Sequence, residues 1–124
     1  MLLFDSFFIR SKSRPDLFWW VEPSGAVATS STSRSRFRID IEGQESGTVI
    51  IRNDLISFVH VGGSQDTQGI VAVKGDSMQL WIAQHYKYCF YYSDLKKAFL
   101  ASSDQHSSIF RVEDGYGEEW ELVR

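Results

Sequence analysis

Apolar and polar residues alternate in short runs along the whole chain, and turn residues such as Gly, Asp, Asn, Ser and Pro separate the runs. In the clearest run, Phe37, Ile39 and Ile41 alternate with charged residues. This period of two places one face of a strand in a core and the other in water. Helical periodicity is almost absent. Twelve strands are predicted, over residues 7–11, 18–22, 26–30, 37–42, 48–52, 56–61, 70–74, 78–83, 88–93, 98–102, 109–113 and 119–123. The chain is therefore expected to be all-β.

The predicted strands fall into three groups of four that match in order. Phe18, Phe58 and Phe99 lie in the second strand of each group, 40 and 41 residues apart. A period near 40 also occurs in β-propellers, but a propeller needs at least about four blades. Three four-stranded units therefore favour a single β-trefoil domain over residues 1–124. Its pseudo-repeats would cover about residues 4–44, 45–86 and 87–124.

Each fourth strand of the predicted trefoil carries a large aromatic residue in an aromatic-x-apolar triplet. These residues are Phe37, Trp81 and Trp120. Because a threefold arrangement brings equivalent positions together, we expect the three rings to meet near the axis. The same closure would remove most exposed sheet edges, which is an advantage for a chain so rich in strands.

Residues 93–101 fit the repeat least well. Read alone, they resemble an amphipathic helix with Ser93 or Asp94 as its N-cap and with Leu95, Ala98 and Phe99 on one face. The repeat favours a short turn at 94–97 followed by a strand at 98–102. A long helix in this segment would instead favour a lipocalin-like or small pleckstrin-like barrel.

Composition and charge narrow the range of partners. The chain is 43% hydrophobic and 23% charged, which is ordinary for a soluble globular protein. Its formal net charge of −3 gives no overall attraction to nucleic acid or to an anionic membrane, so we expect no nucleic-acid partner and no membrane insertion. Cys89 is the single cysteine, and no signal peptide is recognisable. A cytoplasmic protein is the simplest interpretation, with release by a non-standard route left open.

Three tripeptides carry a resemblance to a known family. Gln79-Leu80-Trp81 resembles the Gln-x-Trp signature of ricin-B-type lectins, which are β-trefoils. Glu118-Glu119-Trp120 is a near copy in the third repeat, and Ser35-Arg36-Phe37 keeps only the aromatic residue. At the level of the repeat, the resemblance covers essentially the whole chain and implies a sugar-binding scaffold. In that family an Asp of the second-strand region holds the sugar, and the matching stretches 18–21, 58–61 and 99–101 contain no Asp.

Candidate sugar-binding residues come from the predicted second strands of the first two repeats and from the loops between second and third strands. Trp19 and Trp20 alternate in a predicted strand, so one of them is expected at the surface as a stacking platform for a sugar ring. Asp, Gln and His side chains are good partners for sugar hydroxyls. The candidate carbohydrate-binding residues are Trp19, Trp20, His60, Asp66, Gln68, Asp104 and His106. The alternative is that hairpin packing covers both tryptophans and that the loops are simply solvated.

Basic residues cluster in the first repeat. Arg34, Arg36 and Arg38 share one face of a predicted strand, and Arg10, Lys12 and Arg14 are close in sequence. Such a row suits carboxylates, sulfates or phosphates. Acidic neighbours at Asp16, Asp40 and Glu42 favour the alternative of a solvated, partly ion-paired face.

Catalytic signatures are lacking in the sequence. His60, His85 and His106 lie in separate segments without metal-ligand spacing, so no metal is expected. Cys89 lies in a predicted strand beside Phe90, where a buried, unreactive thiol is expected. The chain contains no nucleophile elbow and no phosphate-binding glycine loop. We therefore expect a binding protein that is not an enzyme and that needs no cofactor.

Three binding functions remain open. The first is a carbohydrate-binding lectin with a glycan or glycoprotein as partner, in which weak single sites would act together through repeats or through a homodimer. The second is a protease inhibitor that uses a surface loop stiffened by proline. The loop residues would be Lys12, Ser13, Arg14, Pro15 and Asp16. The third is a protein–protein interaction module that uses the patch around Trp19 and Trp20.

Overall fold

The computed structural model describes residues 6–41, 54–61, 69–75, 78–83, 88–102 and 107–124. Over these residues the fold is all-β, as the alternating pattern predicts, and no α-helix occurs. The elements are β1 (Ser6–Ser11), β2 (Phe18–Val21), β3 (Val27–Ser30), β4 (Arg36–Ile41), β5 (Leu55–Val61), β6 (Gly69–Lys74), β7 (Gln79–Ala83), β8 (Phe90–Tyr91), the 3₁₀-helix η1 (Tyr92–Lys96), β9 (Phe99–Ala101), β10 (Ile109–Arg111) and β11 (Trp120–Val123). Eleven of the twelve predicted strands overlap these elements, and the one at 48–52 lies outside the described residues.

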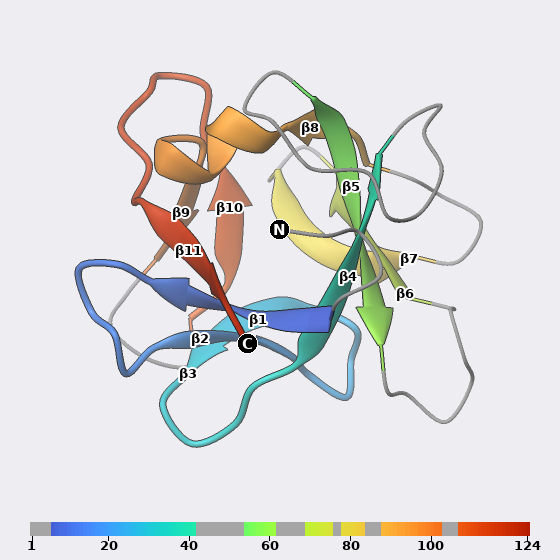
Figure 1. Ribbon diagram of the computed structural model, residues 1–124, viewed down its shortest axis with the longest axis vertical. Coiled ribbons are helices and arrows are strands. Elements are labelled where there is room, and N and C mark those ends of the chain that lie inside the picture. The colour runs from blue at the N-terminus through green and yellow to red at the C-terminus, as the bar shows by residue number, and fades with distance from the viewer. Residues whose placement is uncertain (1–5, 42–53, 62–68, 76–77, 84–87, 103–106) are drawn as a thin grey trace.

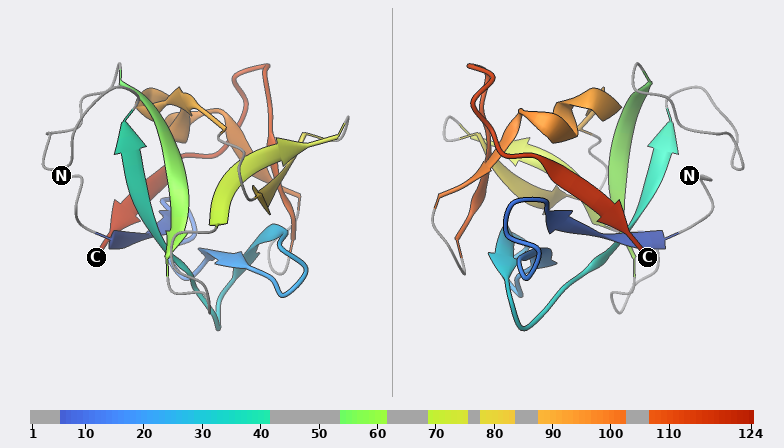
Figure 2. Two further views of the ribbon diagram at one scale, coloured as in Figure 1. Left: turned by 90° about the vertical axis from the view of Figure 1, so that its right-hand side faces the viewer. Right: turned by 60° about the vertical axis from the view of Figure 1, so that its left-hand side comes forward.

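The strands form one antiparallel sheet that curls into a half-barrel (Figure 1). Its order is β3-β2-β1-β4-β5-β6-β7-β10-β9, while β11 also pairs with β1 and β8 with β5. Figure 2 shows the curl from two further directions, with β4 and β5 side by side along their length. Because β1 pairs with β2, β4 and β11, it joins the first and last parts of the chain.

The strand pairing differs between parts of the chain. Hairpins β2–β3 and β9–β10 occupy matching places in the first and third predicted repeats. Between them, β4, β5, β6 and β7 follow one another as an antiparallel meander, in which β4 and β5 pair over six residues. The described pairings therefore establish an all-β curled sheet, an architecture that is compatible with the predicted β-trefoil.

The core is centred on Trp19, whose side chain is 0% exposed. Its ring meets four aromatic rings edge-on, at centroid distances of 5.6 to 6.1 Å. These belong to Phe37, Phe58, Phe99 and Trp120, and come from β4, β5, β9 and β11. Edge-to-face contacts of this kind are favoured by the ring quadrupoles and add to the burial of apolar area. One tryptophan of β2 therefore holds together strands from both ends of the chain.

The expected meeting of Phe37, Trp81 and Trp120 is wrong for Trp81. Phe37 and Trp120 both contact Trp19, but Trp81 is only half-buried and lies outside the core cluster. In β7 it is Leu80 that is fully buried. The sequence of β7 has four consecutive apolar residues, so its pattern does not decide which face points inward. The fold turns Trp81 toward the β2–β3 hairpin, where it forms a bridge with Ala26.

The segment that resembles a helix in the sequence folds as one short 3₁₀-helix followed by a strand. The backbone N–H groups of Lys97 and Ala98 both donate to the Asp94 carbonyl, which ends the helix. Leu95, Ala98 and Phe99 are all buried, as the amphipathic pattern predicts. Strand β9 then begins at Phe99 because β10 supplies a pairing partner there. The predicted short turn before a strand is thus confirmed, and no long helix forms.

Candidate functional site

The candidate sugar-binding residues do not come together in the described structure. Trp19 lies in the core, where a ligand does not reach its ring, and Trp20 on the opposite face of β2 is half-buried. One of the two is thus near the surface, as alternation predicts. His60 is half-buried, with its ring 5.8 Å from that of Phe37, and burial lowers the pKa of His60 below its ordinary 6.5. The other candidates, Asp66, Gln68, Asp104 and His106, lie outside the described residues.

The loop proposed for protease inhibition joins β1 to β2 and is braced against the segment just before β11. Lys12, Ser13, Pro15 and Asp16 are exposed, whereas Arg14 is half-buried. Ion pairs tie the loop to two glutamates, from Lys12 Nζ to Glu119 Oε2 at 3.1 Å and from Arg14 Nη2 to Glu118 Oε1 at 2.7 Å. The backbone N–H of Lys12 donates to the Glu119 carbonyl, and that of Arg14 donates to Ser11 Oγ. Two ion pairs therefore brace the loop, and part of its backbone is already hydrogen-bonded.

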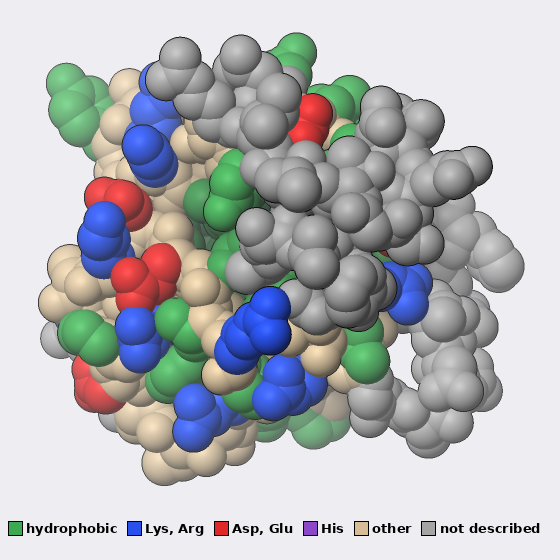
Figure 3. Space-filling model, viewed as in Figure 1, with side chains coloured by type: hydrophobic (Ala, Val, Ile, Leu, Met, Phe, Trp, Pro, Cys, Tyr) green, Lys and Arg blue, Asp and Glu red, His purple; other side chains and the backbone are tan. Residues whose placement is uncertain are grey.

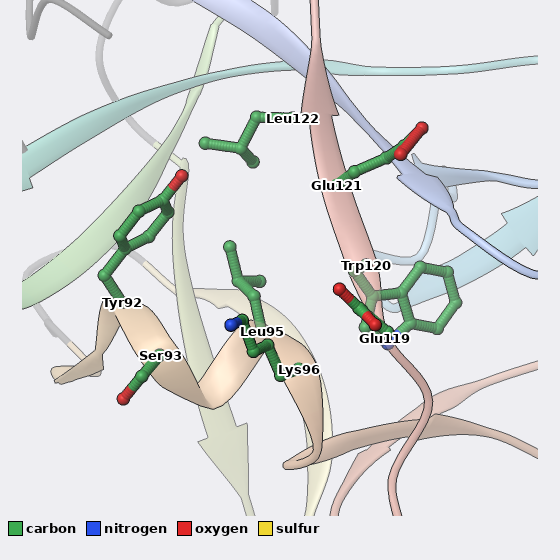
Figure 4. A pocket seen from close by; sticks show the side chains of 8 residues that line it. All are labelled: Tyr92, Ser93, Leu95, Lys96, Glu119, Trp120, Glu121 and Leu122. Atoms are coloured by element: carbon green, nitrogen blue, oxygen red, sulfur yellow. The ribbon is translucent and has the colours of Figure 1, made fainter. Parts of the chain in front are cut away.

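A pocket of about 300 Å³ opens between η1 and β11, and we call it the η1–β11 pocket. Figure 4 shows the two elements facing each other across it. Its lining residues are Tyr92, Ser93, Leu95 and Lys96 on one side, and Glu119, Trp120, Glu121 and Leu122 on the other. This volume is at the lower end of the range for small-molecule pockets, about 300 to 1,000 Å³.

The β11 wall of this pocket is fixed by its pairing with β1. Trp120 pairs with Ser11 and Glu121 with Arg10, so the backbone of the wall is part of the sheet. Glu121 also forms an ion pair with Arg10. The Trp120 ring is 3% exposed, and its Nε1–H donates to the Phe99 carbonyl at 2.9 Å. Trp120 therefore anchors the wall to the core, and the side chains on either side of it line the pocket.

The η1 wall is anchored by one buried side chain. Leu95 is 4% exposed and belongs to the core cluster, while the half-buried Tyr92 packs against that cluster. The Tyr92 N–H donates to the Asp54 carbonyl at 3.0 Å, which ties the start of the helix to the segment before β5. Figure 4 shows Leu95 standing between Tyr92 and Trp120, and Leu122 opposite Tyr92. Both walls therefore rest on the hydrophobic core.

The chemistry of the η1–β11 pocket is mixed. Its apolar surface comes from Tyr92, Leu95 and Leu122, and its polar groups are hydroxyls, carboxylates and one ammonium. Glu119, just before β11, and Lys96 of η1 both line the pocket, so it contains an acceptor and a donor beside the apolar surface. The motif Glu118-Glu119-Trp120 marks the start of β11 in the sequence, but no local pattern indicates that η1 faces it.

A second pocket, of about 330 Å³, lies against the half-buried Trp81. Lys74 places its Nζ 4.5 Å from the centre of the Trp81 ring. The turn before β3 closes the pocket, because the Gly25 carbonyl accepts a hydrogen bond of 2.7 Å from the N–H of Ile82. Gly25 has φ of +94°, a conformation that favours glycine in such three-residue hairpin loops. The Trp81 ring is the aromatic surface of this pocket, and among the described residues its lining contains no carboxylate or amide side chain.

Comparisons with known proteins place the chain in no family: no family model, curated protein or solved structure matches it. Within the described residues, no three His, Cys, Asp or Glu side chains are grouped so that they would hold a metal ion. A helix with the length and apolarity to cross a membrane is also lacking from that part of the chain.

Proposed function

We propose that this protein is a non-enzymatic carbohydrate-binding protein and that the η1–β11 pocket holds the sugar. The observation that carries the proposal is the composition of the pocket, in which an apolar surface is bordered by hydroxyl, carboxylate and ammonium groups. A sugar ring has an apolar face of C–H groups and a rim of hydroxyls that both donate and accept hydrogen bonds. The pocket offers a counterpart to each.

Glu119 and Lys96 would orient the sugar. The ion pair with Lys12 engages Glu119 Oε2, so Oε1 is available to accept a sugar hydroxyl. Lys96 would donate from the opposite wall, and the apolar face of the ring would rest on Tyr92 and Leu122. Because Glu119 is held by Lys12 before the ligand arrives, binding would lose little side-chain entropy at this position.

The size of the pocket suits one or two sugar rings rather than a long chain. A site this small and open would bind weakly on its own. Useful affinity would therefore come from several sites acting together, as in a homodimer or on a glycoprotein that displays many copies of the glycan.

We also propose that the scaffold is a β-trefoil. Support comes from the pairing of β11 with β1, which joins the two ends of the chain, and from the matching hairpins β2–β3 and β9–β10. The proposal requires a strand near residues 48–52 that pairs with its neighbours to complete the middle repeat. Backbone NMR with amide–amide contacts across that segment tests it, and a helix or a free loop there would contradict it.

Protease inhibition is the second candidate, because the loop with Lys12 and Pro15 is exposed and braced. A peptide bound as an added strand uses its main-chain groups to pair with the enzyme. Since the N–H groups of Lys12 and Arg14 are already engaged, we rank inhibition below sugar binding.

A glycan array tests the proposed function, with titration calorimetry on any sugar that binds. Tyr92→Ala and Lys96→Ala should each weaken binding about tenfold, the loss expected for one good hydrogen bond or ring contact. Tyr91→Ala and Lys97→Ala are matched controls, because Tyr91 is 54% exposed and neither residue lines the pocket. An array without sugar binding, or equal losses in the variants and their controls, would refute the proposal.

A further inference from the structure

Two exposed arginines lie over two phenylalanine rings on the outer surface beside β1. The Arg34 guanidinium carbon is 4.5 Å from the centre of the Phe18 ring and 4.9 Å from that of Phe8. The Arg36 guanidinium carbon is 4.2 Å from the Phe8 ring centre. The two rings are half-buried and meet edge-on at 6.1 Å. We call these four residues the Arg34–Arg36 surface.

Four other arginines each form an ion pair with a described carboxylate. Arg10 pairs with Glu121, Arg14 with Glu118, Arg38 with Asp40 and Arg111 with Asp94. No described carboxylate lies within ion-pair distance of Arg34 or Arg36. Among the described residues, the hydrogen bonds of Arg36 are long, at 3.4 Å from Nη1 to the carbonyl and hydroxyl oxygens of Ser6. Among the described residues, therefore, these two cations on one aromatic base form a local positive site, on a protein whose net charge is −3. Figure 3 shows basic side chains gathered on the lower part of this face.

The Phe8 and Phe18 rings restrict the positions of the two guanidinium groups. A guanidinium that lies over an aromatic ring is held by cation–π attraction, while its N–H groups remain free to bind a carboxylate in bidentate fashion. Part of the entropy that a flexible arginine would lose on binding has therefore been lost already. The arginines are two residues apart, where the chain enters β4, so their Cα atoms are separated by about 7 Å.

We propose that the Arg34–Arg36 surface binds an extended acidic segment of another protein, in which Asp or Glu residues alternate with other residues. In an extended peptide, side chains at positions i and i+2 point the same way and are also about 7 Å apart. Two such carboxylates match the two guanidiniums one to one. A side chain between or beside them would contact the exposed parts of Phe8 and Phe18. This site is separate from the η1–β11 pocket, and the proposal does not depend on sugar binding.

A nucleic acid fits the same surface less well. Binding to a polyanionic backbone is built from many phosphate contacts, and two arginines would neutralise only two phosphates. A long polyanion would also have to run past Asp40 on β4 or past Glu121 on β11, which pairs with β1. A short acidic peptide needs no more than the two cations that the surface provides.

The test is fluorescence anisotropy with a labelled peptide of alternating Glu and Thr. The comparison probes are a Lys–Thr peptide, a single-stranded oligonucleotide and a heparin fragment, each of similar length. The combined variant Arg34→Gln/Arg36→Gln should weaken binding of the Glu–Thr peptide about tenfold or more, because two charge-assisted hydrogen-bonding groups are lost. Arg34→Lys/Arg36→Lys should recover only part of that loss, since lysine keeps the charge but not the planar donor fork.

Arg38→Gln is the matched control. Arg38 follows on the same strand, but it already faces Asp40 at 3.8 Å, so its loss should change peptide affinity less than about twofold. Peptide binding that is undetectable at millimolar concentration would overturn the proposal, and so would equal losses in Arg38→Gln and the double variant. Tighter binding of the oligonucleotide or the heparin fragment through the same two arginines would assign the surface to a different polyanion and reject the acidic peptide.

Discussion

Replacing Trp19 and Trp120 in turn by phenylalanine should have unequal effects on stability, although the chemical change is the same. Both rings lie in the core, at 0% and 3% exposure. Each substitution removes two ring carbons and the indole N–H and leaves a small cavity. The loss of apolar contact costs about 2 kcal/mol in each case. The surroundings of the two N–H groups decide the difference.

The Trp19 Nε1–H is buried and has no hydrogen-bond partner among the described residues. Removing a buried, unpaired donor recovers about 1–3 kcal/mol. The Trp120 Nε1–H donates to the Phe99 carbonyl at 2.9 Å, and its removal loses about 1 kcal/mol. That carbonyl also accepts the Glu118 N–H at 2.9 Å, so it keeps a partner. Trp19→Phe should therefore be close to neutral, and Trp120→Phe should cost about 3 kcal/mol.

Urea unfolding measures the free energies of unfolding of both variants. Circular dichroism of the backbone is the better signal, because fluorescence comes from the four tryptophans, one of which each variant removes. Equal m-values would show that the two variants unfold from comparably compact states. If Trp19→Phe destabilises the protein as much as Trp120→Phe, or more, the assignment of Trp19 Nε1 as an unpaired donor is refuted.

Two further predictions concern backbone packing and pH. Gly117→Ala should destabilise the protein by about 2 kcal/mol or more in urea unfolding, because the added Cβ would lie 2.4 Å from the Lys97 carbonyl oxygen. Gly75→Ala should cost only about 1 kcal/mol in the same assay, because its Cβ would enter open space and only the φ of +67° is unfavourable. Burial lowers the pKa of His60 in the folded protein below 6.5, so its contribution to stability is complete above pH 6.5 and declines as the pH falls toward the folded value. His60→Gln should flatten this decline when unfolding midpoints at about pH 7.5 and about pH 5.5 are compared with the wild type, and an unchanged decline would contradict the prediction.

Much of the secondary structure was predictable because strands carry their own signal. Alternation in β4 placed Phe37, Ile39 and Ile41 inward, and all three are buried. The same rule predicts that Trp19 and Trp20 lie on opposite faces of β2, and Trp19 is buried while Trp20 is half-buried. The rule fails in β7, where Leu80 and Trp81 are both apolar, so alternation does not show which of them points inward. The buried face of β7 was set by its partners rather than by its own residues.

The candidate site was harder to predict, because a pocket depends on elements that are distant in sequence. The tripeptide motif pointed to β11, and the amphipathic pattern pointed to Leu95, yet nothing in either segment shows that they face each other. The same holds for the ion pairs between the β1–β2 loop and β11, since Lys12 and Glu119 are 107 residues apart. Charge pairing over such a distance has no local signature.

The sequence by itself determined that this chain forms short strands with one apolar face, because side-chain alternation and turn residues act over a few residues. Only the tertiary structure decided which tryptophan lies at the centre of the core and that β11 faces η1. It also decided which arginines lie over aromatic rings and which lie beside carboxylates. These outcomes depend on how the curled sheet brings its faces together. Packing and charge pairing are interactions between segments that are distant in sequence, so they cannot be inferred from a local sequence pattern.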